Sequence, residues 1–185
     1  MLSRRRLITA ASAWAGVSAA TAWVPRALAA SAEAAPVLKR VKLNNLHTPE
    51  SLDIVFRRGN DYIPEALERI QVLLRDYRTG DQHPIDPRLL DYLHEAARRA
   101  GVDPEFGVIS GYRSARTNAM LHARSSEVAT HSLHMEGRAI DVRLAGVDCA
   151  DLAAAALELS RGGVGYYRHS DFVHLDTGRF RTWRG

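Results

Sequence analysis

The sequence predicts an α+β fold in which a small antiparallel sheet is flanked by helices. Two kinds of pattern lead to this prediction. Short segments with alternating apolar residues are separated by turn residues, which is typical of strands joined as hairpins. Longer segments carry apolar residues at helical spacing behind a proline or an N-cap residue. Helices mixed with hairpins along one chain favour the α+β class.

The first half of the chain supplies a hairpin and two helices. Residues 37–46 and 51–56 have strand character, and 47–50 suits the turn between them. A helix is expected over 64–77, because Pro64 fits a first helical turn and the residues behind it form an apolar stripe: Leu67, Ile70, Leu74 and Tyr77. Asp86-Pro87 begins a second helix, which Gly101 ends.

The second half supplies the remaining strands and helices. We expect a short buried strand at 106–109, a glycine-containing turn at 110–114, a helix at 115–123, a polar surface loop at 124–130, a strand at 139–144, a helix at 151–159 ended by Gly162-Gly163, and strands at 164–167 and 172–176 joined over 168–171. The last two strands form a second hairpin.

The first thirty residues look like an export signal rather than part of the fold. Arginines at 4–6 begin a basic region, an Ala/Val/Trp-rich stretch follows, and Ala27-Leu-Ala29 resembles a signal-peptidase site. We therefore predict a twin-arginine-type signal peptide over 1–29, a flexible lead-in over 30–36 and a single domain over 37–185. This predicts a periplasmic protein with no stable membrane insertion after signal cleavage. The alternative is a protein tethered to the membrane by an uncleaved leader.

Charge and cysteine content exclude some classes of function and of stabilising cross-link. The whole chain has a net charge of +4, but its first thirty residues contain four arginines and no acid. The remainder is therefore balanced, with 21 basic and 21 acidic residues, and gives no electrostatic case for nucleic acid binding. Cys149 is the only cysteine, so no intrachain disulfide is available.

Three residues have the character of zinc ligands. His134 and Asp141 lie seven residues apart with Gly137 between them, and His174 lies in a later strand-like segment. Side chains alternate across a strand, so Asp141 and His174 point away from their apolar neighbours and converge if the two strands are adjacent. Two histidines and a carboxylate suffice for a catalytic zinc with one open position. The alternatives are a satisfied polar histidine and an Asp141 that pairs with a neighbouring arginine.

Several separated segments agree with a known family in their order along the chain. They are Ser110-Gly-Tyr-Arg-Ser114, Ser132-Leu-His-Met-Glu-Gly-Arg-Ala-Ile-Asp141, Gly162-Gly-Val-Gly-Tyr-Tyr167 and Phe172-Val-His-Leu-Asp176. This combination resembles the zinc peptidases of the D-Ala-D-Ala carboxypeptidase type, within the lysostaphin and hedgehog-like superfamily. The likeness is greatest to the exported murein endopeptidases of Gram-negative bacteria.

The resemblance implies roles for individual residues. His134, Asp141 and His174 correspond to the ligands of one Zn²⁺ per chain, and Arg113 corresponds to an arginine that stabilises oxyanion charge. For the general base, the correspondence with the family is less direct. Asp171 stands where relatives have the glutamate of Glu-x-x-His, and it is one methylene shorter.

Two other residues are alternatives for parts of this machinery. His131, three residues before His134, has a counterpart in some murein endopeptidases and is a second candidate for the base. Asp176 shares a strand face with His174 and is a candidate for orienting that histidine.

The function implied by the resemblance is hydrolysis of peptide cross-links in peptidoglycan. The partners are then peptidoglycan stem peptides, and the protein is expected to be a monomer. A D-Ala carboxypeptidase is the second enzyme that fits. A non-catalytic module that binds zinc and peptidoglycan is the alternative of a different class.

Overall fold

A computed structural model describes residues 35–125 and 128–185. The signal peptide expected at 1–29 and most of the lead-in expected at 30–36 lie outside the described residues. Within the described part of the chain, every helix is too short or too polar to cross a bilayer.

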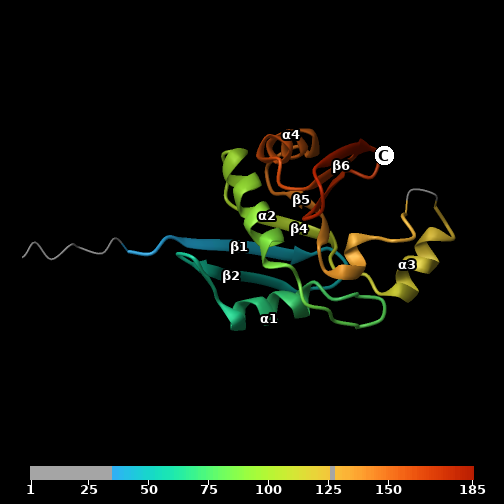
Figure 1. Ribbon diagram of the computed structural model, residues 1–185, viewed down its shortest axis with the longest axis horizontal. Coiled ribbons are helices and arrows are strands. Elements are labelled where there is room, and N and C mark those ends of the chain that lie inside the picture. The colour runs from blue at the N-terminus through green and yellow to red at the C-terminus, as the bar shows by residue number, and fades with distance from the viewer. Residues whose placement is uncertain (1–34, 126–127) are drawn as a thin grey trace, which may run out of the picture. The chain divides into compact units, whose positions relative to one another are not determined.

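Residues 35–125 and 128–185 form eight strands, four α-helices and one 3-10 helix (Figure 1). In chain order they are β1 (Leu38–Asn45), β2 (Ser51–Arg58), β3 (Asp61–Tyr62), α1 (Pro64–Leu73), α2 (Pro87–Arg99), β4 (Glu105–Ser110), α3 (Ala115–His122), η1 (Leu133–Glu136), β5 (Ala139–Leu144), α4 (Cys149–Leu159), β6 (Gly163–Tyr167), β7 (Phe172–Asp176) and β8 (Arg181–Arg184). The α+β class is confirmed.

The sheet is larger than predicted and is not purely antiparallel. Its order is β3-β2-β1-β4-β5-β7-β6-β8, and β1 pairs with β4, and β6 with β8, in parallel. The prediction of a small antiparallel sheet was wrong because it considered hairpins alone. A parallel pair needs a long crossover, which α1 and α2 supply between β2 and β4. Strand β8 was missed because Arg181-Thr-Trp-Arg184 has no apolar alternation.

Most helix predictions are confirmed, with changes at their ends. Helix α1 ends at Leu73 instead of residue 77. The carboxylate of the buried Asp76 accepts hydrogen bonds from the backbone N–H groups of Arg78 and Ser114, which holds the chain in a turn there. Helix α4 begins two residues earlier than expected, at Cys149. The 3-10 helix η1 was not predicted.

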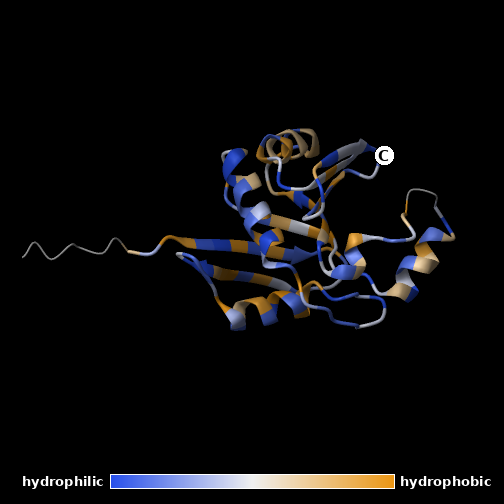
Figure 2. Ribbon diagram, in the orientation of Figure 1, coloured by the Kyte–Doolittle hydropathy of each residue, from blue (hydrophilic) through white to orange (hydrophobic). Residues whose placement is uncertain are grey.

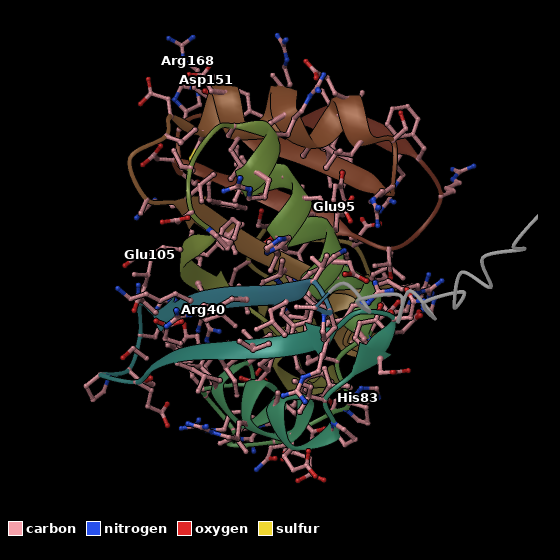
Figure 3. All side chains as sticks on the ribbon, turned by 90° about the vertical axis from the view of Figure 1, so that its left-hand side faces the viewer. Arg40, His83, Glu95, Glu105, Asp151 and Arg168 are labelled. Atoms are coloured by element: carbon pink, nitrogen blue, oxygen red, sulfur yellow. The ribbon has the colours of Figure 1, made fainter. Side chains whose placement is uncertain are left out.

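One apolar core supports the sheet. Helices α2 and α4 pack against each other, α2 also against β1 and β5, and α4 against β5, β6 and β7, whereas α1 packs on β2 (Figure 1). Polar and apolar residues interleave along β1 and α1 (Figure 2), as expected for elements with one buried face. Figure 3 shows the side of the molecule that lies at the left in Figure 1. Acidic and basic side chains are interspersed on it, among them Arg40, Glu95, Glu105, Asp151 and Arg168.

A buried carboxylate ties α2 to the first three strands. Asp91 accepts hydrogen bonds from Lys39 on β1, Arg57 on β2 and Tyr62 on β3, and its side chain is only 5% exposed. Burial alone would raise the pKa of Asp91, but the hydrogen bonds from Lys39 and Tyr62 and the charge of Arg57 hold it below its usual value. The ionised form of Asp91 therefore stabilises the fold.

We predict that Asp91→Asn lowers the free energy of unfolding by about 2–4 kcal/mol, because it leaves the half-buried Arg57 without its ion-pair partner and leaves Lys39 with Glu95 alone. A carboxylate whose pKa is lower in the folded state than in the unfolded state stabilises the fold at pH values above its unfolded-state pKa. That stabilisation is lost as the pH falls through the folded-state pKa. Urea titrations between pH 6 and pH 3 should show that the free energy of unfolding falls less on acidification in the variant than in the wild type.

The exposed Asp53, which pairs with Arg40, is the control. Asp53→Asn should lower the free energy of unfolding by less than about 1 kcal/mol. Equal effects would contradict this account.

Candidate metal centre

The strand pairing brings two of the predicted ligands side by side. Strands β5 and β7 are antiparallel neighbours, and Asp141 pairs directly with His174 in their register. The apolar neighbours Ile140, Val142 and Val173 are fully buried in the core. Because side chains alternate along each strand, this register sends the carboxylate and the imidazole to the same face of the sheet. The geometry expected for this pair is confirmed.

The third residue reaches the same point from a short helical turn. His134 lies in η1, which begins behind the N-cap Ser132 and ends at Gly137 in the left-handed conformation, with φ of 65°. A Cβ at Gly137 would lie 2.1 Å from the Pro84 carbonyl oxygen, so this tight turn requires glycine. The Nδ1 atom of His134 lies 2.7 Å from the Gly111 carbonyl oxygen, which fixes the ring.

Three atoms able to bind a metal converge at this point. His134 Nε2 lies 3.2 Å from Asp141 Oδ1 and 3.2 Å from His174 Nδ1, and His174 Nδ1 lies 2.8 Å from Asp141 Oδ1. All three residues are buried, and their ligand atoms lie within 4.8 Å of one another. The group could therefore hold a metal ion, and two nitrogens with one carboxylate oxygen match the donors that zinc takes.

The outer nitrogen of each histidine is occupied, which leaves the inner nitrogen for a metal. His134 Nδ1 faces the Gly111 carbonyl, and His174 Nε2 lies 3.0 Å from Asp176 Oδ2. When these outer nitrogens donate their protons, His134 Nε2 and His174 Nδ1 present lone pairs to the centre. The orienting role considered for Asp176 agrees with this geometry.

Asp176 is itself held rigidly. Its fully buried carboxylate accepts two hydrogen bonds from Arg181, at 3.0 and 2.7 Å, and one each from the backbone N–H groups of Gly163 and Gly178. Burial would raise the pKa of Asp176, but hydrogen bonds from His174 and Arg181 lower it well below its usual value. The carboxylate therefore stays ionised and fixes the orientation of His174.

Burial and charge set the protonation of the three residues. Burial lowers the pKa of His134, and the charge of Asp141 offsets only part of this effect. Burial also disfavours charge on His174, but hydrogen bonds to Asp141 and Asp176 outweigh it and raise its pKa. Burial would raise the pKa of Asp141, yet His134 and His174 hold it well below its usual range. A cation that binds here therefore replaces a proton.

Arg113 lines the same site, and its guanidinium makes only long hydrogen bonds there. Its Nη2 atom lies 3.5 Å from both Asp141 Oδ2 and Ser110 Oγ, and its Nη1 atom lies 3.4 Å from Asn118 Oδ1. Its buried Nε has no hydrogen-bond partner among the described residues. Burial lowers the pKa of Arg113 and Asp141 partly restores it. A buried and poorly satisfied guanidinium is suited to an incoming anion or polarised carbonyl.

The structure separates the two residues expected as alternative bases. His131 is exposed and lines the pocket that contains the three clustered residues. Asp171 does not line that pocket; it lies at the β6–β7 turn with a φ of 51°, and its carboxylate pairs with Arg143 at 3.2 Å. The structure thus brings His131 toward the cluster and does not bring Asp171 there.

The pocket has a volume of about 380 Å³ and two contrasting walls. Its floor contains Arg113 and the three clustered residues. One wall comes from the segment 128–133, and the other comes from β6, β7 and β8 with their preceding turns. A ligand that enters this pocket therefore lies between the segment 128–133 and the strands β6, β7 and β8.

Sequence patterns did not reveal three residues that complete this site. The buried Asn118 on α3 donates hydrogen bonds to the carbonyls of residues 129 and 130, so it ties the pocket wall to the helix beside Arg113. Trp183 on β8 lies 5.2 Å from His174 between ring centroids. Gly111 approaches Leu74 so closely that a Cβ would meet its carbonyl oxygen at 2.6 Å. The visible signals were a polar residue at 118 on a short helix and the place of Gly111 in the 110–114 turn.

Comparison with known proteins identifies the family. The family model described as peptidoglycan L,D-endopeptidase MepK matches residues 33–183. The chain belongs to this family. The peptidoglycan L,D-endopeptidase MepK of Escherichia coli (strain K12) is 40% identical over 181 residues, which cover 98% of this chain and 97% of the relative. The probable peptidoglycan L,D-endopeptidase MepK of Haemophilus influenzae is 40% identical over 151 residues, or 81% of each chain.

These matches confirm the resemblance to murein endopeptidases drawn from the ordered motifs. The family match spans all the described elements except the last residue of β8, Arg184. No solved structure matches the chain.

Proposed function

We propose that this chain is a zinc-dependent L,D-endopeptidase that hydrolyses peptide cross-links in peptidoglycan, with a single catalytic domain over 37–185. The observation that carries the proposal is the convergence of His134 Nε2, Asp141 Oδ1 and His174 Nδ1 in a pocket beside the buried Arg113. Membership of the MepK family supports the reaction and the substrate class.

The donor set fits zinc, and His134, Asp141 and His174 would hold it. A bound zinc ion supplies Lewis-acid polarisation of the scissile carbonyl and a more acidic water. Asp176 keeps the His174 ring in the orientation that presents Nδ1. Arg113 directs its guanidinium at the carbonyl oxygen and stabilises the negative charge that develops there.

A proton acceptor completes the chemistry, and we assign it to His131. This imidazole lines the pocket, and it can take a proton from water and return it to the leaving amine. Asp171 remains the alternative from sequence spacing. The support for His131 is its place in the pocket wall, since Asp171 is engaged by Arg143.

The leader suggests where the reaction takes place. Three arginines at 4–6 precede an apolar stretch and an Ala-x-Ala pattern at 27–29, and we propose that they direct twin-arginine export to the periplasm. Peptidoglycan is then accessible to the folded domain.

We predict that the zinc-loaded protein removes diaminopimelate–diaminopimelate cross-linked dimers from purified sacculi, as resolved by muropeptide chromatography. His134→Ala should abolish both bound zinc and this activity, because one ligand is lost. His169, an exposed residue of the β6–β7 turn, is the control, and His169→Ala should keep both. Release of single D-Ala residues would instead indicate a carboxypeptidase, and stoichiometric zinc without any product would indicate a binding module.

His131→Ala should lower kcat by about 10²–10⁴-fold while zinc stays bound, because general-base catalysis contributes about that factor. Asp171→Asn should change kcat by less than about threefold, because its carboxylate faces Arg143. The kcat values of the two variants are compared by steady-state kinetics on a soluble cross-linked dimer, with zinc content measured in parallel. The reverse ranking would assign the base to Asp171.

Asp176→Asn should weaken zinc binding by about 10–100-fold, the usual effect of losing a hydrogen-bond partner of a metal-binding histidine. Competition with a chromogenic chelator measures this without any turnover. Asp148→Asn, at an exposed position before α4, serves as the control and should bind zinc normally. Unchanged affinity in Asp176→Asn would remove the orienting role.

A further inference from the structure

Three aromatic side chains form one wall of the pocket. Tyr167 of β6, Phe172 of β7 and Trp183 of β8 all line it, and each is partly exposed. We call these three residues the aromatic panel. None of them binds or transfers anything in the chemistry described above, so their presence beside the cluster calls for a separate explanation.

The panel is a connected and fixed surface. The rings of Tyr167 and Phe172, which are register partners, stack with centroids 4.5 Å apart and planes 14° apart. The Trp183 indole donates its Nε1 hydrogen to the Tyr167 hydroxyl at 3.0 Å. The guanidinium of Arg181 lies 4.9 Å from the Trp183 ring centroid. The rings are therefore held in place before any ligand arrives, which reduces the entropy lost on binding.

A glycine allows the panel to reach the cluster. Gly165 is the register partner of both His174 and Trp183, so it lies between them across three adjacent strands. A Cβ at this position would lie 2.5 Å from the indole ring. Only a residue without a side chain lets Trp183 lie against β6 with its ring 5.2 Å from that of His174.

The chemistry of the panel selects its ligand. The indole N–H is already bonded to Tyr167, so the wall offers mainly ring hydrocarbon to whatever lies beside the cluster. Arg113 and the panel line the same pocket, so a peptide whose scissile carbonyl lies near Arg113 can place an adjacent side chain against this wall. In a peptidoglycan stem peptide, the diamino acid residue at a cross-link has a straight chain of methylene groups that matches such a surface.

We propose that the aromatic panel is a specificity subsite that binds the aliphatic chain of the diamino acid next to the scissile bond. This proposal rests on the proposed function, because it takes its substrate class from there. The panel determines which peptide is held and contributes to substrate binding, whereas the metal ligands and Arg113 act on the carbonyl.

Tryptophan fluorescence tests binding without catalysis. The chain has three tryptophans, and Trp14→Phe with Trp23→Phe in the full chain leaves Trp183 as the only one. Titration with the stem tripeptide L-Ala-γ-D-Glu-diaminopimelate should shift or quench the Trp183 emission saturably. The same peptide with alanine in place of diaminopimelate should bind at least about tenfold more weakly. Equal binding of the two, or a response to the disaccharide alone, would overturn the proposal.

Kinetics on the cross-linked dimer provide the second test. Phe172→Leu should lower kcat/KM by about tenfold, mainly through KM, because it removes one ring of the wall and leaves the catalytic groups in place. Zinc content should not change. Phe180→Leu is the matched control, since Phe180 is 53% exposed and lies outside the pocket lining, and it should retain wild-type kcat/KM.

The two proposals fail in different ways. Cleavage by the wild-type chain with unchanged kinetics in Phe172→Leu would overturn the subsite and leave the endopeptidase function intact. Saturable binding of the tripeptide at Trp183 without any cleavage would support the subsite and overturn the endopeptidase. Absence of both binding and cleavage would overturn the two together.

Discussion

The site depends on the register between β5 and β7, which places Asp141 directly opposite His174. A slip of one residue would send one of these side chains into the core and bring an apolar residue to the cluster. The register is fixed from behind, because Ile140, Val142, Val173 and their neighbours are buried against α2 and α4. The same apolar packing that stabilises the domain therefore determines where its polar ligand atoms meet.

Around that pair, each further component constrains the next. The turn at Gly137 brings His134 over the strands, Asp176 orients His174, and Arg181 holds Asp176. Removing water from two imidazoles and a carboxylate is costly unless they are paired or bind a cation. The described residues leave Arg113 as the poorly satisfied charge in the pocket. A buried guanidinium without its full set of hydrogen bonds costs stability, and preorganised polar groups of this kind are common in catalytic sites.

Much of this centre could be predicted because strand alternation is a local property. It placed Asp141 and His174 on one face, and Gly137 indicated the turn that carries His134. The sheet order could not be predicted in the same way, because the parallel pairing of β1 with β4 depends on packing between distant segments. Trp183 escaped notice for a related reason: β8 has no apolar alternation, and only its pairing with β6 brings the indole to His174.

The most direct test of the account is a crystal structure of the zinc-loaded chain with anomalous scattering measured at the zinc edge. We expect a single ion about 2.0–2.2 Å from His134 Nε2, an Asp141 carboxylate oxygen and His174 Nδ1, with His174 Nε2 still bonded to Asp176. An ion held through His174 Nε2, or one bound elsewhere in the chain, would contradict it.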